Sequence, residues 1–207
     1  MGRPRLYVFE GADGVGKSEI CRRFVSYLRT SGTECEHFSF PGREAGTLGK
    51  VVYEIHHQPS AHGVSAISAS SLQLLHIAAH VDAIENRIAP MLREGKTIVL
   101  DRFWWSTKVY GTVSGVPRRV LDGMIETELA AWNSIRPTCL FLITRQLPLR
   151  PEPADLWKRW CEAYVKLASE EREKYPVVVI ENEGAIEDVD QAISAALLKL
   201  GTTSEHS

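Results

Sequence analysis

The chain has 207 residues, the length of one α/β domain, and its hydrophobic content of 44% is ordinary for a globular protein. Its 24 lysines and arginines are balanced by 26 aspartates and glutamates, so the overall charge argues against a nucleic-acid-binding protein. The sequence shows no signal-peptide core and no apolar run of membrane-spanning length. We therefore expect no nucleic-acid partner and no membrane partner.

The four cysteines show neither C-x-x-C spacing nor a cluster with histidines that would ligate a metal. Cys21 and Cys139 fall in segments expected to be buried. We therefore expect reduced thiols and a cytoplasmic location.

Apolar runs of strand length alternate with longer segments of helical periodicity, a pattern typical of a parallel sheet covered by helices on both faces. The strands are predicted near residues 5–10, 34–39, 97–101, 138–143 and 176–181. The helices are predicted near residues 17–30, 45–57, 66–94, 118–133, 154–173 and 186–200. Pro90 predicts a kink or break within the third helix. We expect a single domain over residues 1–200 and a disordered tail over 201–207.

The first predicted strand runs directly into a phosphate-binding loop. Residues 10–19 read EGADGVGKSE and match the pattern G-x-x-x-x-G-K-S, with the first predicted helix following. Backbone N–H groups of such a loop, together with the positive end of the helix, hold the phosphates of a nucleoside triphosphate. Lys17 would reach the outer phosphates and Ser18 would ligate Mg²⁺. The predicted nucleotide-binding residues are Gly11, Asp13, Gly14, Val15, Gly16, Lys17, Ser18 and Glu19.

Asp13 is an unusual residue for this loop, because bound phosphates would repel its carboxylate. We therefore expect its side chain to face a neutral group, such as a sugar hydroxyl of the phosphate acceptor.

Charged residues also follow the next three predicted strands, at Arg43, at Asp101-Arg102 and at Arg145. Ligands of open parallel sheets bind beyond the carboxyl ends of the strands, so these residues should converge on the loop. Asp101 suits Mg²⁺, and Arg102 can grip a phosphate with two hydrogen bonds. For Arg43 a second phosphate grip and a solvated loop arginine are equally consistent with the sequence.

Together these segments resemble the thymidylate kinase family, whose members transfer the γ-phosphate of ATP to dTMP. The resemblance rests on FEGADGVGKS at 9–18, FPGR at 40–43, LLHIAAH at 74–80 and DRFWWSTKVYG at 101–111. It runs in register from about residue 5 to 112 and resumes more weakly at 137–143 and 164–168. It implies a three-layer P-loop NTPase fold with a five-stranded parallel sheet, ATP and Mg²⁺ as cofactors, small nucleotide substrates and a homodimer.

The resemblance also implies the roles of residues on the acceptor side. Asp13 would hold the 3′-hydroxyl of the acceptor, Arg43 and Arg102 its phosphate, and Thr107 would lie near its base. The residues expected to bind this substrate are Asp13, Phe40, Pro41, Arg43, His76, His80, Arg102, Thr107 and Tyr110.

Two of these residues depart from the family pattern. His76 stands where the family has a phenylalanine that stacks on thymine, and His80 stands where it has an arginine that bonds the thymine O4. The acceptor base is therefore left open, and two packed histidines without a ligand role remain an alternative. A metal site on this i, i+4 pair is disfavoured because no third ligand is evident.

The segment after the fourth strand is shorter, by about ten residues, than the arginine-bearing lid of the family. It supplies Arg145 and Arg150, and Gly14 stands where some members have an arginine in the loop. We expect Arg145 or Arg150, or else Lys108, to supply the charge that stabilises the transferring phosphoryl group.

The favoured function is a nucleoside monophosphate kinase that phosphorylates a (deoxy)pyrimidine monophosphate, with dTMP first among the candidates. Its predicted catalytic residues are Lys17, Asp101, Arg102, Arg145 and Arg150, with Ser18 and Asp101 as metal ligands. Two alternatives stay open: a P-loop kinase for a modified or non-thymine acceptor, and a nucleotide-binding protein with weak transfer activity.

Overall fold

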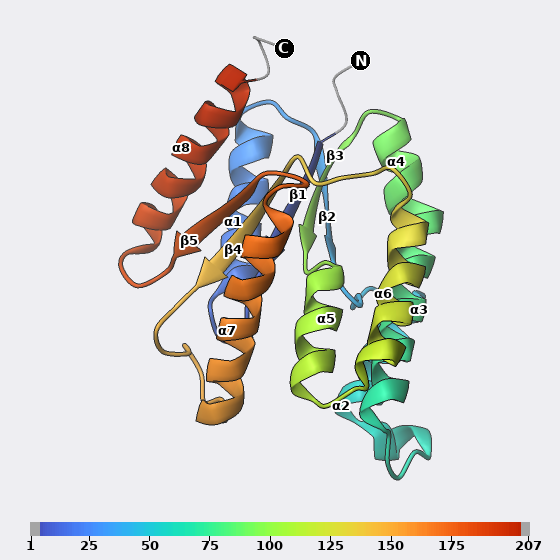
Figure 1. Ribbon diagram of the computed structural model, residues 1–207. Helices are drawn as coiled ribbons and strands as arrows, with labels where there is room; N and C mark the ends of the chain where they lie inside the picture. Colours follow the sequence, from blue (N-terminus) through green and yellow to red (C-terminus); the bar gives the residue numbers. More distant parts are fainter. Residues whose placement is uncertain (1–4, 204–207) are drawn as a thin grey trace.

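The computed structural model describes residues 5–203, with side chains for residues 5–200. Five parallel strands form one sheet in the order β2-β3-β1-β4-β5 (Figure 1). The strands are β1 (Arg5–Glu10), β2 (Cys35–Ser39), β3 (Thr97–Asp101), β4 (Cys139–Thr144) and β5 (Val177–Glu181). The predicted five-stranded parallel sheet is confirmed.

Helices cover both faces of this sheet. On one face α1 (Lys17–Thr30) packs beside α8 (Ile186–Thr203), and the other face carries α5 (Trp104–Val113) and α7 (Ala154–Glu171) (Figure 1). The helices α3 (Ala69–Ala83) and α6 (Arg118–Trp132) pack next to α5, and α2 (Leu48–His57) packs on α3. A short 3₁₀ turn, η1 (Pro59–His62), follows α2. α8 continues three residues beyond its predicted end at 200, and positions 204–207 of the expected tail lie outside the described residues.

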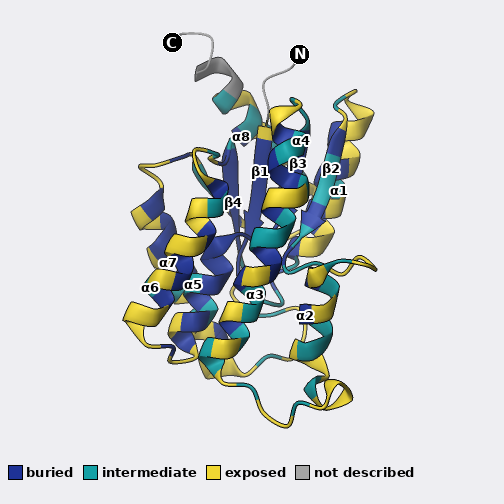
Figure 2. Cartoon of the chain, turned by 90° about the vertical axis from the view of Figure 1, so that its right-hand side faces the viewer, coloured by how far each residue is buried: buried dark blue, intermediate teal, exposed yellow. Residues whose placement is uncertain are grey.

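The central strands are buried on both faces, as Figure 2 shows for β1, β3 and β4. Every residue of β3 is buried, and β1 is buried from Leu6 to Glu10. Each large apolar side chain buried in this way contributes about 1.5–3 kcal/mol. Cys21 and Cys139 are both fully buried and free, as predicted. The core thus fixes the strands whose carboxyl ends carry the candidate site.

The predicted irregularity at Pro90 is confirmed. In place of one helix over 66–94, α3 passes through a π-helical turn, η2 (Ile84–Ile88), into α4 (Ala89–Arg93). Proline lacks the N–H for a helical hydrogen bond, and its ring would clash with the carbonyl four residues back. The wider turn before Pro90 relieves that clash.

Helix α5 is the one α-helix within residues 5–203 that we did not expect from the sequence. Seven of its ten residues are buried, among them Trp104 and Trp105. A helix buried on most of its circumference shows no polar stripe, so helical periodicity is not visible in its sequence. Within the described part of the chain, no helix combines the length and apolar character that a membrane crossing requires.

Candidate active site

The phosphate loop lies between β1 and α1, at the carboxyl edge of the sheet. Gly11, Gly14 and Gly16 all have positive φ angles, of 142°, 80° and 92°. At Gly16 a side chain is excluded as well, because a Cβ would lie 2.6 Å from Asn182 Nδ2. The same amide of Asn182 donates to the Val15 carbonyl at 2.8 Å. The end of β5 therefore braces the loop from behind.

Lys17 is folded into this loop. It is 6% exposed, and its Nζ donates to the Ala12 carbonyl at 3.0 Å. Burial, reinforced by the Arg102 charge, lowers the pKa of Lys17 to about 8. Glu19, also predicted to bind nucleotide, is exposed on the first turn of α1, and its side chain pairs with Arg22.

Ser18 and Asp101, the two predicted metal ligands, are brought together. Ser18 Oγ donates to Asp101 Oδ2 at 2.8 Å, although 83 positions separate the residues. Asp101 Oδ1 is buried and has no hydrogen-bond partner. A hydroxyl and an unsatisfied carboxylate oxygen are the hard oxygen ligands that Mg²⁺ prefers. The residues present therefore fit a magnesium ion.

Arg102 forms an ion pair with Asp13 across the mouth of the loop. Its guanidinium also donates to Ser106 Oγ at 3.0 Å and lies over the Tyr110 ring, 5.4 Å from the centroid. Arg102 has a positive φ of 77°, a strained conformation for a residue with a side chain. The Tyr110 hydroxyl accepts from the Asp13 N–H at 3.0 Å, so both residues hold the loop.

The expectation that Asp13 faces a neutral group is wrong for its Oδ1 atom, which faces the Arg102 guanidinium. Burial alone would raise the pKa of Asp13, but the charges of Arg102 and Lys17 outweigh it and lower that pKa. Arg102, the cation that follows β3, attracts this carboxylate, and repulsion by bound phosphates does not account for that attraction.

Glu10 is a site residue that sequence reasoning missed. Its carboxyl group is fully buried and accepts from the Phe103 N–H at 2.7 Å, from Ser106 Oγ at 2.8 Å and from the Tyr164 hydroxyl at 3.0 Å. Burial raises the pKa of this carboxyl. Glu10 thus caps α5 and, through Ser106, steadies Arg102. The sequence signal that could have identified Glu10 is its position as an acidic residue at the end of an apolar strand.

The short lid segment rests on the phosphate loop. The Leu149 N–H donates to the Gly14 carbonyl at 2.8 Å, and a Cβ at Gly14 would lie 3.0 Å from Pro148 Cβ. Trp157 Nε1, at the start of α7, donates to the Asp13 carbonyl at 2.7 Å. Gly14 therefore serves the close approach of the lid as well as the turn of the loop.

Of the three cations considered for the transferring phosphate, Arg150 lies at the loop. Its guanidinium is 3.6 Å from Asp13 Oδ1 and donates to Glu152 Oε1 at 2.7 Å. Arg145 instead donates to the Asn182 carbonyl, and Lys108 pairs with Asp122 at 2.6 Å.

Three of the residues expected on the acceptor side, Phe40, Pro41 and Arg43, follow β2. Phe40 and Pro41 are joined by a cis peptide bond, and together with Arg43 they line a hollow that extends to Ala79 of α3. The Arg43 guanidinium lies over the Tyr53 ring, 4.5 Å from its centroid. Thr107 is 2% exposed, and its hydroxyl has no partner.

The two histidines of α3 have different surroundings. His80 is buried, lies flat against Phe40 with ring centroids 4.1 Å apart, and its Nδ1 is 3.0 Å from Glu128 Oε2. His76 Nε2 is 3.2 Å from Nδ1 of His56, a residue of α2 that sequence reasoning missed. Burial lowers the pKa of His76 to about 2, so its ring is neutral. Among residues 5–203 no group of three potential ligands could hold a metal ion.

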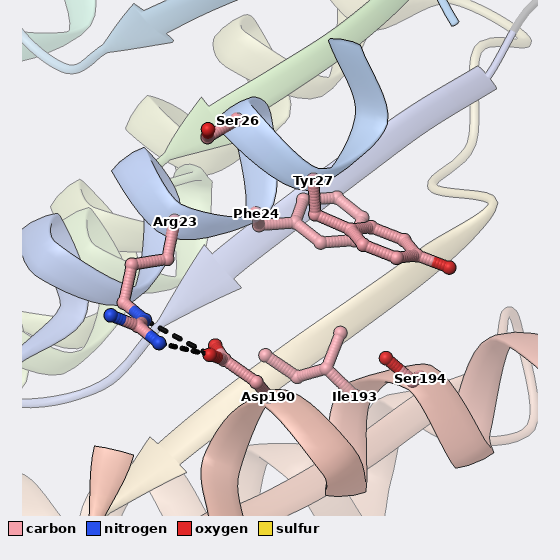
Figure 3. Close-up of a pocket in the computed structure, with 7 residues that line it drawn as sticks. All are labelled: Arg23, Phe24, Ser26, Tyr27, Asp190, Ile193 and Ser194. Atoms are coloured by element: carbon pink, nitrogen blue, oxygen red, sulfur yellow. Dashed lines mark hydrogen bonds and ion pairs between the residues drawn. The ribbon is translucent and has the colours of Figure 1, made fainter. Parts of the chain in front are cut away.

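A second hollow, between α1 and α8, is separate from this site (Figure 3). The ion pair between Arg23 and Asp190 crosses it, with Arg23 Nε 3.0 Å from Asp190 Oδ2. Its lining residues are Arg23, Phe24, Ser26, Tyr27, Asp190, Ile193 and Ser194.

Comparison with known proteins gives one consistent family. The family model "Thymidylate kinase" matches residues 9–148. A thymidylate kinase of Chlorobium luteolum is 33% identical over 81% of the chain and 72% of its own length, and one of Bartonella quintana is 30% identical over 89% and 91%. The crystal structure of thymidylate kinase from Ehrlichia chaffeensis superposes with a TM-score of 0.77 over 93% of the chain and 98% of its own, at 19% identity. This last likeness supports the fold.

Proposed function

Since the chain belongs to the thymidylate kinase family, we propose that it transfers the γ-phosphate of ATP to dTMP. The observation that carries the proposal is the Arg102–Asp13 pair. It sets a phosphate-gripping guanidinium and a carboxylate against the mouth of a phosphate loop. A protein that only hydrolysed ATP would have no need for such groups on the acceptor side.

The donor would bind on the loop, with Lys17 and the first turn of α1 at its phosphates. Mg²⁺ would be held by Ser18 and Asp101, where it would offset negative charge on the phosphates. Lys17 Nζ donates to the Ala12 carbonyl and would exchange that contact for a phosphate oxygen.

The acceptor would lie beyond the ends of β2 and β3. We propose that Arg102 and Arg43 hold its phosphate, that Asp13 holds its 3′-hydroxyl, and that its base lies against α3 near Thr107. We propose Arg150 as the lid cation; the distance of 3.6 Å between its guanidinium and Asp13 Oδ1 supports this choice. An arginine in that position favours an active kinase over a protein that binds nucleotides without transfer.

We also propose that the protein forms a homodimer and that it is located in the cytoplasm. Exposed apolar side chains on α2, α3 and α6, at Val51, Leu74 and Leu129, would be covered in a homodimer. Light scattering of the purified protein would give its mass in solution. The four free cysteines fit the reducing cytoplasm.

The proposed activity is tested by coupling ADP formation to an indicator reaction, with Mg-ATP and a panel of nucleoside monophosphates. We expect dTMP to be phosphorylated, and Arg102→Lys to raise the KM for dTMP at least tenfold while leaving the KM for ATP within twofold. Lys17→Met supplies the inactive control. The proposal would be abandoned if no pyrimidine monophosphate were phosphorylated.

A further inference from the structure

Two side chains from outside the phosphate loop hold carbonyl groups of its backbone. Trp157 Nε1, in α7, donates to the Asp13 carbonyl at 2.7 Å. Asn182 Nδ2, directly after β5, donates to the Val15 carbonyl at 2.8 Å. Trp157 and Asn182 are each only 6% exposed, so water competes little for these two hydrogen bonds.

The other two carbonyl groups of this stretch are bonded as well. The Leu149 N–H of the lid segment donates to the Gly14 carbonyl at 2.8 Å, and Lys17 Nζ donates to the Ala12 carbonyl at 3.0 Å. The four successive carbonyl groups of residues 12–15 therefore each accept a hydrogen bond. The orientation of every peptide unit in the turn of the loop is thereby specified.

These hydrogen bonds decide where the N–H groups of the loop point. In a trans peptide unit the C=O and N–H bonds lie in one plane and point in opposite directions. The bond from Trp157 thus turns the Gly14 N–H away from α7, and the bond from Asn182 turns the Gly16 N–H away from the end of β5. Gly14 and Gly16 have φ angles of 80° and 92°, which lets successive N–H groups face one concavity.

Glycine peptide units need such restraint more than others do. A glycine adopts positive and negative φ about equally well, so the loop backbone by itself has several orientations of similar energy. A peptide unit turned the other way would present its carbonyl oxygen to the donor phosphates and repel them. Correcting that orientation on binding would lower the affinity for the nucleotide.

We propose that Trp157 and Asn182 are positioning residues for the phosphate donor, and that they hold the loop carbonyls outward so that the loop N–H groups face the donor phosphates. The inference rests on the proposed function, because it takes these phosphates to lie on the loop. Both residues act through the loop backbone rather than through the nucleoside. The loop should therefore bind a polyphosphate that carries no base.

The test measures binding of Mg-ATP, and of inorganic tripolyphosphate with Mg²⁺, by calorimetry. Trp157→Phe and Asn182→Leu each keep most of the side-chain volume and remove the donor to the carbonyl. We expect each variant to bind both probes about tenfold more weakly than the wild type. Trp160→Phe is the matched control, because Trp160 lies on the same helix and its Nε1 has no hydrogen-bond partner within the described chain. Its affinity for both probes should stay within twofold of the wild type.

Thermal midpoints show whether the variants are folded, and Asn182→Leu decides the test if Trp157→Phe does not fold. The inference would be overturned, with a kinase function left standing, if the variants bound tripolyphosphate as tightly as the wild type. A loss confined to Mg-ATP, or an equal loss in Trp160→Phe, would overturn it too, as would a wild type that bound Mg-ATP but not tripolyphosphate. If the wild type binds neither probe, the inference and the proposed function both fail.

Discussion

The buried charge of Lys17 destabilises the folded protein, so replacing this residue should raise the free energy of unfolding. The fall of its pKa from the usual 10.5 to about 8 corresponds to roughly 3 kcal/mol that the folded state loses by holding a buried ammonium. Lys17→Met keeps the length of the side chain and removes the charge. It also removes the hydrogen bond to the Ala12 carbonyl, which offsets about 1 kcal/mol. We therefore expect a gain of about 2 kcal/mol in the free energy of unfolding at pH 7, together with loss of phosphoryl transfer.

The pH dependence gives this prediction a sign that can be checked. Below pH 8 the lysine is protonated in both the folded and the unfolded chain, so the advantage of the methionine variant is constant. Between about pH 8 and 10.5 the unfolded wild type binds a proton that the folded state has released, so wild-type stability rises relative to the variant. The advantage should therefore be complete at pH 7 and should shrink steadily toward pH 10.

Urea unfolding of both proteins at pH 7, 8, 9 and 10 measures this difference. Lys50→Met is the matched control, because Lys50 lies on α2 in a half-exposed pair with Glu54, with Nζ 3.0 Å from Oε1. Its effect should stay within about 0.5 kcal/mol at every pH. A Lys17→Met variant less stable than the wild type at pH 7, or an advantage that did not shrink by pH 10, would refute the reasoning.

The lid and the loop give two further predictions. Arg150→Gln should lower kcat by about 10³-fold or more and change the thermal midpoint little. Arg145→Gln loses the hydrogen bond to the Asn182 carbonyl at the end of β5, so it should mainly lower the thermal midpoint. Steady-state kinetics and calorimetry on both variants separate the two roles, and equal losses of kcat would contradict this assignment. Gly14→Ala and Gly63→Ala both place a side chain at positive φ, of 80° and 70°, and each should cost about 1–2 kcal/mol in urea unfolding. Only Gly14→Ala meets the lid, so it alone should raise the KM for ATP, and an unchanged KM would show that the lid contact is dispensable.

The main features of the site were predictable because its charged residues follow buried parallel strands. The alternation of apolar runs and helical segments predicted the sheet, and the parallel order of its strands requires their carboxyl ends to meet at one edge. Ser18 lies in the first turn of α1, just after the loop that follows β1, and Asp101 ends β3; their hydrogen bond of 2.8 Å is the direct result. The motif G-x-x-x-x-G-K-S predicted the loop and the lysine that would bind the donor phosphates, because this pattern between a strand and a helix is typical of a phosphate-binding loop.

The features that were missed depend on contacts between segments far apart in the sequence. α5 escaped prediction because most of its side chains are buried, which removes the polar stripe of a surface helix. Glu10, at the end of β1, caps α5 by accepting from the N–H of Phe103, 93 positions further along the chain. No local sequence pattern marks such a cap. The partners His56 and Glu128 likewise reach the α3 histidines from other helices, 20 and 48 positions distant.

Asp13 has one role that the resemblance implies and another that the structure shows. The resemblance implies that it holds a sugar hydroxyl, whereas the structure pairs it with arginines, and its two carboxylate oxygens allow both. Oδ1 takes Arg102 and lies 3.6 Å from Arg150, and a carboxylate has further lone pairs that a hydroxyl can use. A carboxylate whose pKa is lowered by neighbouring cations stays ionised and remains an acceptor for a hydroxyl. Because the same carboxylate orients Arg102, the groups for the acceptor phosphate and for the acceptor sugar are held at a fixed distance before any ligand binds.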